Sequence, residues 1–240
     1  MSFDQQPISA CRVDLLRRLR RLGGAFACLV VIATTSHAVT TLPATAKDAG
    51  SIRPISDAMW QAMVGVSWHR GRGCTQRSGL RLLTVPYVDF SGAPQTGHLI
   101  VARDVARGVL SAFARMRSSG FRIARMEPVH VFGGSDARSM AANNTSGFNC
   151  RLKSSGRGLS EHAKGRAIDI NPVQNPYVSR RGIFPPAGRT FATRVARRRG
   201  HIGLITRGGA AHQAFRSIGW GWGGNWRRLK DYQHFSKSGR

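Results

Sequence analysis

Apolar positions along this chain follow two periods, which predict an alternation of helices and short strands. Spacings of three and four residues predict an amphipathic helix over residues 52–66 and another over 105–118. A shorter helix is expected over 210–218, and a single helical turn over 227–230. The apolar stripe of the second helix would consist of Val105, Val109, Ala112, Phe113 and Met116.

Short runs of β-branched and aromatic residues predict strands between these helices. They are expected at residues 80–90, 99–102, 167–170 and 232–235. Pro86 lies inside the first of them, which favours a sheet edge or a break at that position. The order of elements, without an internal repeat, predicts an α+β fold: a small antiparallel sheet with flanking helices.

Polar, glycine-rich and proline-rich stretches are predicted to be loops. They cover residues 68–79, 171–189 and 219–226. The polar stretch 132–149 is long for a connection, and long structureless segments inside compact domains are usually functional. Arg138 is its main candidate for chemistry, and an ordinary surface arginine is the alternative.

Residues 1–38 have the layout of a secretory signal peptide. Five arginines precede the apolar stretch 23–35, which is too short to span a bilayer comfortably. Residues 36–38 (Ser-His-Ala) place small side chains where a signal peptidase reads. Residues 39–50 are then a linker and 51–240 the mature domain, in a secreted or periplasmic protein. An uncleaved membrane anchor is the alternative.

The cysteines divide between the leader and the mature domain. Cys11 and Cys28 lie in the leader, which leaves Cys74 and Cys150. An even pair in an oxidising compartment predicts a disulfide, with two buried thiols as the alternative. Neither cysteine has a Cys or His partner at finger-like spacing, which disfavours zinc ligation by them.

The chain is strongly basic, with 37 lysines and arginines against 11 acidic residues. Such a charge attracts polyanions, which outside the cytoplasm are cell-wall polymers and lipid head groups. Nucleic-acid binding is not expected, because the sequence carries no helix-turn-helix, finger or RNA-binding signature. A solvated basic surface without a binding role is the alternative to a functional basic patch.

Residues 160–169, which read S-x-H-x-x-G-x-A-x-D, hold the densest chemistry of the chain. Gly165 permits a tight turn after His162. The alternation of a strand then puts Asp169 on the opposite face from the isoleucines beside it.

A second segment completes this set far downstream, where Asp231 precedes His234 by three residues. His162, Asp169 and His234 offer three metal ligands, and three ligands with one open position are the composition of a catalytic zinc site. Asp231 is a spare carboxylate of the kind that metal-assisted hydrolysis uses as a general base.

The same residues carry a resemblance to a known family. Over about residues 80–236 the chain resembles zinc peptidases of the D-alanyl-D-alanine carboxypeptidase and L-alanyl-D-glutamate endopeptidase family, which share the fold of the Hedgehog signalling domain. It is most similar to the subgroup that reads AIDINPxxNPY and GWGWGG. Four stretches match in order: GGSDARSMAANNTSGFNCR (133–151), LSEHAKGRAIDINPVQNPYV (159–178), PPAGR (185–189) and IGWGWGGNWRRLKDYQHFS (218–236).

The resemblance implies one Zn²⁺ per chain, held by His162, Asp169 and His234, with Asp231 as the catalytic carboxylate. It further implies supporting and substrate-facing roles for two other residues. Ser160 would support the site, and Arg138 would lie near the scissile carbonyl. Asn225 departs from the pattern, because many relatives have Asp there, and this affects a local loop contact rather than the metal.

The function implied is hydrolysis of the stem peptides of peptidoglycan, either as a D-Ala-D-Ala carboxypeptidase or as an L-Ala-D-Glu endopeptidase. The alternative is a non-catalytic, basic cell-wall-binding module on the same fold. It is disfavoured because all three ligand types and the general base are present. The bond that is cut stays open.

The remaining histidines and the tryptophans near the second segment are expected to be structural. Trp220, Trp222 and Trp226 would pack in the core or a loop, with the lining of a substrate cleft as the alternative. The histidines without suitably spaced partners are His69, His98, His130, His201 and His212.

Overall fold

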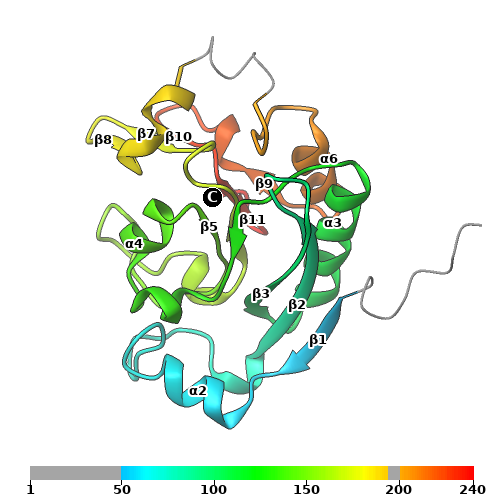
Figure 1. Ribbon diagram of the computed structural model, residues 1–240. Helices are drawn as coiled ribbons and strands as arrows, with labels where there is room; N and C mark the ends of the chain where they lie inside the picture. Colours follow the sequence, from blue (N-terminus) through cyan, green and yellow to red (C-terminus); the bar gives the residue numbers. More distant parts are fainter. Residues whose placement is uncertain (1–49, 194–200) are drawn as a thin grey trace, which may run out of the picture. The chain divides into compact units, whose positions relative to one another are not determined.

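The longest strands pair into an antiparallel sheet in the order β1-β2-β3 (Figure 1). Its strands are β1 (Ser51–Pro54), β2 (Leu80–Val88) and β3 (Pro94–Ala102). This computed structural model describes residues 50–193 and 201–240.

The predicted signal peptide at 1–38 and linker at 39–50, except Gly50, lie outside the described residues. Within the described part, no helix is both long enough and apolar enough to cross a membrane.

β2 lies between β1 and β3, but the sheet edge or break predicted at Pro86 is present locally. Pro86 is tolerated in β2 because β1 pairs only with residues 81–84, so that Pro86 faces Thr96 of β3 and has no partner in β1.

β3 begins earlier than predicted. The Asp89 carboxylate accepts hydrogen bonds from the backbone N–H groups of Ser91 and Ala93 and so closes the turn before β3.

The sheet separates two hydrophobic clusters because successive side chains of a strand point to opposite faces. Leu83 of β2 and its partner Leu99 of β3 belong to the larger cluster, which includes helix α3 (Ala106–Ser118). Leu82 and its partner Ile100 face the smaller cluster. The predicted apolar stripe of α3 is confirmed, since all five of its residues are buried.

The first predicted helix is shorter than expected. Residues 51–54 form β1, and the helix α2 covers Asp57–Met63. The Ser56 side chain accepts a hydrogen bond from the N–H of Met59, which marks the N-cap and explains why the helix begins there.

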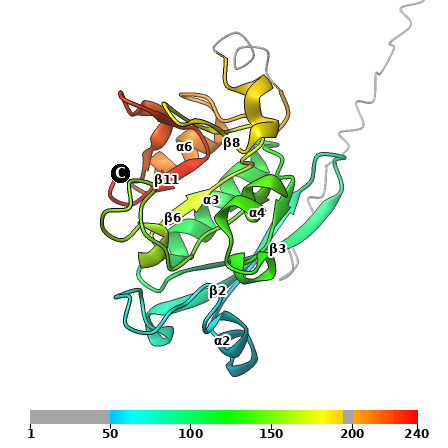
Figure 2. The same ribbon diagram turned by 90° about the vertical axis from the view of Figure 1, so that its left-hand side faces the viewer.

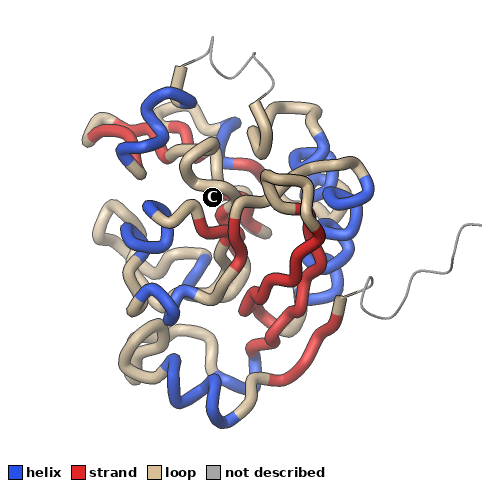
Figure 3. Tube along the Cα trace, viewed as in Figure 1, coloured by secondary structure: helices blue, strands red, loops and turns tan. Residues whose placement is uncertain are grey.

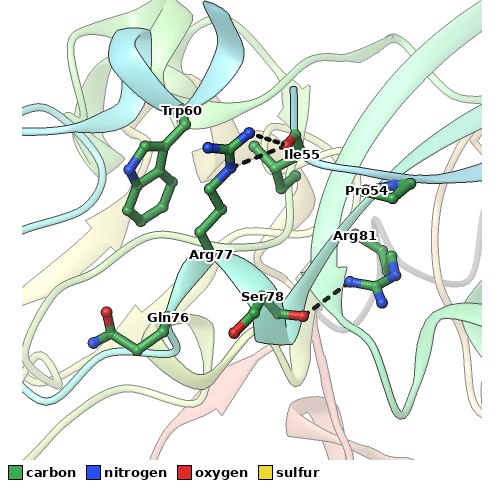
Figure 4. Close-up of a pocket in the computed structure, with 7 residues that line it drawn as sticks. All are labelled: Pro54, Ile55, Trp60, Gln76, Arg77, Ser78 and Arg81. Atoms are coloured by element: carbon green, nitrogen blue, oxygen red, sulfur yellow. Dashed lines mark hydrogen bonds between the residues drawn. The ribbon is translucent and has the colours of Figure 1, made fainter. Parts of the chain in front are cut away.

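An arginine fastens the joint between β1 and α2 (Figure 4). Arg77 begins η1 (Arg77–Gly79), and its guanidinium donates twice to the carbonyl of Ile55, at 3.1 and 2.8 Å. Asp57 adds an ion pair at 2.6 Å. Trp60 and Arg81 line the hollow beside it. Because these contacts occupy the Arg77 guanidinium, we interpret the residues around the hollow as structural.

The predicted disulfide is confirmed: Cys74 and Cys150 are bonded, with their Cα atoms 5.7 Å apart. Both cysteines are buried in the smaller cluster, where they pack with Phe148. The bond therefore ties the loop before β2 to the segment that precedes residues 160–169.

The other strands are short and joined by loops (Figures 1 and 3). Helix α6 packs against α3 and β9. A second antiparallel sheet has the order β6-β11-β9, a third the order β10-β7-β8, and β4 pairs with β5 in parallel. The bounds are β4 Arg125–Met126, β5 Asn144–Thr145, β6 Ala167–Asp169, β7 Tyr177–Ser179, β8 Gly182–Phe184, α6 Ala210–Arg216, β9 Gly221–Trp222, β10 Lys230–Asp231 and β11 His234–Ser236.

The α+β prediction is thus confirmed, whereas several loop predictions need correction. The stretch 132–149 contains the helix α4 (Asp136–Ala141) and β5. The stretch 171–189 contains the β7–β8 hairpin. Residues 227–229 are bends before β10, so the helical turn predicted at 227–230 is wrong.

Two buried asparagines hold the end of β6 in place. Asn171 has a positive φ of 46° and bonds through its amide to Ala124 N–H and the carbonyls of Arg122 and Gly203. Asn175 likewise donates to the Gly203 carbonyl and accepts from Ile205 N–H. The DINPVQN part of the motif therefore positions β6 against chain segments on both sides of it in sequence.

Removing the disulfide should destabilise the fold. A C74S/C150S variant loses a crosslink across a sequence separation of 76, and a crosslink of that length contributes about 2–5 kcal/mol. Urea unfolding without reductant is expected to show a lower midpoint than for the native chain. An unchanged midpoint would mean that the smaller cluster needs no crosslink.

Candidate metal centre

Strand pairing brings two of the three predicted ligands together. In the β6–β11 ladder, His234 lies directly opposite Asp169, and the backbone of Asp169 also exchanges two hydrogen bonds of 2.9 Å with Ser146. His162 begins η3 (His162–Lys164), after which Gly165 takes a φ of +67° and returns the chain to β6. The turn predicted at Gly165 is therefore present.

The three side chains converge on one point. The Nε2 of His162 lies 3.1 Å from an Asp169 carboxylate oxygen and 3.2 Å from the Nδ1 of His234. That Nδ1 lies 3.0 Å from the other oxygen of Asp169. All three residues are buried.

The backbone fixes which ring nitrogen of His162 faces this point. Its Nδ1 is 2.6 Å from the carbonyl of Gly147, and because a carbonyl can only accept, Nδ1 carries the hydrogen. Nε2 then directs a lone pair at Asp169. A backbone carbonyl behind a histidine is the arrangement that orients metal-binding imidazoles.

These residues fit a zinc ion. An imidazole lone pair and a carboxylate 3.1 Å apart repel each other unless a cation or a proton lies between them. Ligand atoms about 2.0–2.1 Å from a tetrahedral zinc are about 3.3 Å from one another, close to the separations seen here. Two histidines and an aspartate also match the donor types that zinc prefers.

The pKa shifts of the clustered residues also favour a bound cation. Burial alone would raise the pKa of Asp169, but the two histidines hold it far below its usual range. Burial opposes protonation of His162, yet the charge of Asp169 and the hydrogen bond to it raise the pKa of that imidazole. The anionic Asp169 thus attracts positive charge to the point of convergence.

Asp231 is not one of the three candidate ligands. It lies on β10, where it pairs with Tyr177 of β7. It is partly buried, and its Oδ1 has no hydrogen-bond partner within the described residues. Burial raises its pKa to about 7. Gly223 packs against it so closely that a Cβ there would lie 2.5 Å from the Asp231 carbonyl oxygen. This contact gives a physical reason for glycine in GWGWGG.

The other two predicted site residues, Ser160 and Arg138, differ in burial and in hydrogen-bond partners. Ser160 is buried, and its Oγ accepts a hydrogen bond from the backbone N–H of His162. Arg138 of α4 is exposed, and its guanidinium donates to the carbonyls of Phe132 and Gly133 at 2.9 and 3.3 Å. These bonds tie the Arg138 side chain to the segment just before its own helix.

A second arginine whose backbone lies near the cluster is Arg151, which the sequence analysis did not single out. Its charge lowers the pKa of both His162 and Asp231, although burial has the larger effect on each. The Ser160 N–H donates to its carbonyl at 3.1 Å, so the chain folds back to place Arg151 beside the residue two before His162. A signal was present in the sequence, since Arg151 directly follows Cys150 and ends the first matched stretch.

The three tryptophans of the second segment differ in their distance from the hydrophobic core and from His234. Trp220 and Trp222 are buried in the larger cluster, as predicted for core packing. Trp226 is half-buried, and its ring centroid lies 5.5 Å from that of His234. It is therefore the tryptophan that could contact a ligand at the site.

Comparison with known proteins gives one match. Residues 153–237 match the model of a family described as D-alanyl-D-alanine carboxypeptidase. The matched part is just over a third of the chain and contains the three candidate ligands and Asp231. No curated protein and no solved structure matches the chain.

The match supports a peptidase of the D-alanyl-D-alanine carboxypeptidase kind. The mixed architecture with small antiparallel sheets is consistent with the fold that such peptidases have. The narrower subgroup with AIDINPxxNPY and GWGWGG stays a prediction.

The raised pKa of Asp231 makes the stability of the metal-free protein depend on pH. An acid whose pKa is higher in the folded state holds its proton more tightly there, so its contribution to stability falls as pH rises from about 4 to about 7. Asp231→Asn is neutral throughout and escapes this loss. In EDTA, its stability advantage over the native chain should grow by about 2–3 kcal/mol between pH 5 and pH 8. Urea unfolding at both pH values tests this, and an advantage independent of pH would contradict it.

Proposed function

We propose that this protein is a zinc-dependent peptidase that hydrolyses peptide bonds in the stem peptides of peptidoglycan. The observation that carries the proposal is the convergence of His162, Asp169 and His234, with the partly buried carboxylate of Asp231 close enough to interact electrostatically with Asp169 and His234. All four residues lie within the part of the chain that matches the carboxypeptidase family.

Zinc, when bound, supplies a Lewis acid that acidifies water and polarises a peptide carbonyl. His162, Asp169 and His234 would hold it. The Asp231 carboxylate accepts the proton of the attacking water and later delivers it to the leaving amine. A pKa raised by burial suits this exchange, because a general base works best when its pKa is near the working pH.

Arg151 supplies positive charge where the peptide carbonyl develops negative charge, the role that the resemblance implied for Arg138. The backbone of Arg151 lies beside Ser160 and its charge lowers the pKa of His162 and Asp231, whereas the Arg138 guanidinium is bonded to two carbonyls just before α4. Charge-assisted hydrogen bonds of this kind stabilise oxyanions or substrate carboxylates.

The place of action that we propose is outside the cytoplasm. The Cys74–Cys150 disulfide is consistent with an extracellular location. Secretion through a signal peptide at 1–38 and attraction of anionic wall polymers to the basic surface extend this proposal. Both fit a substrate that lies in the cell wall.

Activity should require zinc and Asp231. Purified muropeptides incubated with zinc-loaded mature protein are expected to lose a terminal alanine (carboxypeptidase) or to release the peptide tail after L-Ala (endopeptidase). Asp231→Asn should lower the rate by about 10²- to 10⁴-fold, the usual contribution of a general base, while zinc content stays the same. Mass spectrometry identifies the products. No zinc-dependent product from the native protein would contradict the peptidase proposal and favour the wall-binding module.

The two arginines should separate in the same assay. Arg151→Ala is expected to lower kcat/KM by about 10²- to 10³-fold, as for loss of an oxyanion donor. Arg138→Ala, a matched change on the exposed side of α4, should remain within a factor of about three of the native rate. The reverse result would restore the role that the resemblance gave to Arg138.

A further inference from the structure

An ion pair connects the candidate site to α4. The Nη2 of Arg151 lies 3.1 Å from an Asp136 carboxylate oxygen. The side chains of Arg151 and Asp136 are 25% and 34% exposed, and Arg151 is the least exposed of the Lys and Arg side chains in the ion pairs found within residues 50–193 and 201–240. A partly desolvated pair is less screened than an exposed one and holds its geometry better.

Asp136 is itself held firmly. It is the first residue of α4, whose N-cap Ser135 accepts a hydrogen bond from the N–H of Arg138. Gly134 packs so closely on the Val66 carbonyl that a Cβ there would overlap it. The Asn149 side chain donates to the Gly134 carbonyl at 3.2 Å, one residue before the disulfide cysteine Cys150.

Arg151, by contrast, has few other anchors. Its Nη1 makes a 3.3 Å hydrogen bond to the carbonyl of the adjacent Leu152, and its buried Nε has no partner within the described residues. A long side chain fixed so lightly would adopt several rotamers without the carboxylate. Asp136 also balances Arg151 in charge, since the two act in opposite senses on the pKa of His162 and of Asp231.

We propose that Asp136 is a positioning residue that holds the Arg151 guanidinium toward the substrate carbonyl. The inference rests on the proposed function and adds a residue to it that no resemblance or match assigns. α4 then serves as a support for the site, on the same side of β11 as the β10-β7-β8 sheet that carries Asp231 (Figures 1 and 2).

The test is a double-mutant cycle on muropeptide hydrolysis. Asp136→Asn should lower kcat/KM by about 10- to 100-fold, mostly through kcat, with zinc affinity and melting temperature close to native. Asp136→Glu, which keeps the charge, should recover part of the loss. Combining Asp136→Asn with Arg151→Ala should give no further loss than Arg151→Ala alone, because Asp136 acts through Arg151.

Asp57→Asn is the matched control, because it removes an aspartate–arginine pair at the β1–α2 joint. It should leave kcat/KM unchanged. Native activity in Asp136→Asn, or losses that multiply in the double variant, would overturn the proposal. A merely structural role would instead lower the melting temperature and zinc affinity together.

A second measurement does not depend on activity. In ¹⁵N NMR of the native protein, the Arg151 guanidinium should show the separate, slowly exchanging Nη signals of an immobilised side chain. In Asp136→Asn these should collapse to the averaged signals of a mobile one. Averaged signals in the native protein would overturn the positioning role. An inactive native protein with an immobilised Arg151 would instead overturn the proposed peptidase function.

Discussion

The antiparallel pairing of β6 with β11 is the constraint on which the candidate site depends. It sets His234 opposite Asp169, although the two residues are 65 positions apart in the chain. Because strand side chains alternate, the same register that buries Ile168 and Phe235 in the larger cluster turns Asp169 and His234 to the other face. A slip of one residue would bury the ligands in the apolar core and expose the core residues.

Much of the surrounding structure fixes this register. Asn171 and Asn175 tie the chain after β6 to the segments around Ala124 and Gly203. Gly147 offers its carbonyl to His162, two residues after β5 ends. The disulfide at Cys150 anchors the chain just before Arg151. Residues outside the candidate metal site thus set the orientation of the residues that form it, as expected for a site that must be preorganised.

The features that could be predicted from the sequence are those that depend on residues close together in the chain. The stripe of α3, the turn at Gly165 and the alternation around Asp169 depend on a few adjacent residues, and the structure confirms them. The sequence did not show that β1 covers the first half of β2, because β1 is defined by its pairing rather than by its own composition. The helix α4 was not predicted because its six residues include one large apolar side chain, Met140, and so carry no clear apolar period.

Arg151 shows the same limit in the site itself. Its position depends on a bridge between Leu152 and Leu159 and on the bond from Ser160 N–H, which no spacing reveals. The three ligand candidates and Asp231 could be named from residue types in two short motifs, whereas the charge that acts on them comes from a fold-back of the chain. Sequence patterns therefore indicate candidate metal ligands more readily than side chains that come near them only through such a fold-back.

Zinc binding by His162, Asp169 and His234 is the central claim. X-ray absorption at the zinc edge tests it most directly. Zinc-loaded mature protein is expected to bind one ion, with a first shell of two imidazole nitrogens and two oxygens at about 2.0–2.1 Å and no sulfur. The His162→Ala and His234→Ala variants should lose that signal. A sulfur shell, or zinc retained unchanged in both variants, would place the metal elsewhere and contradict the account.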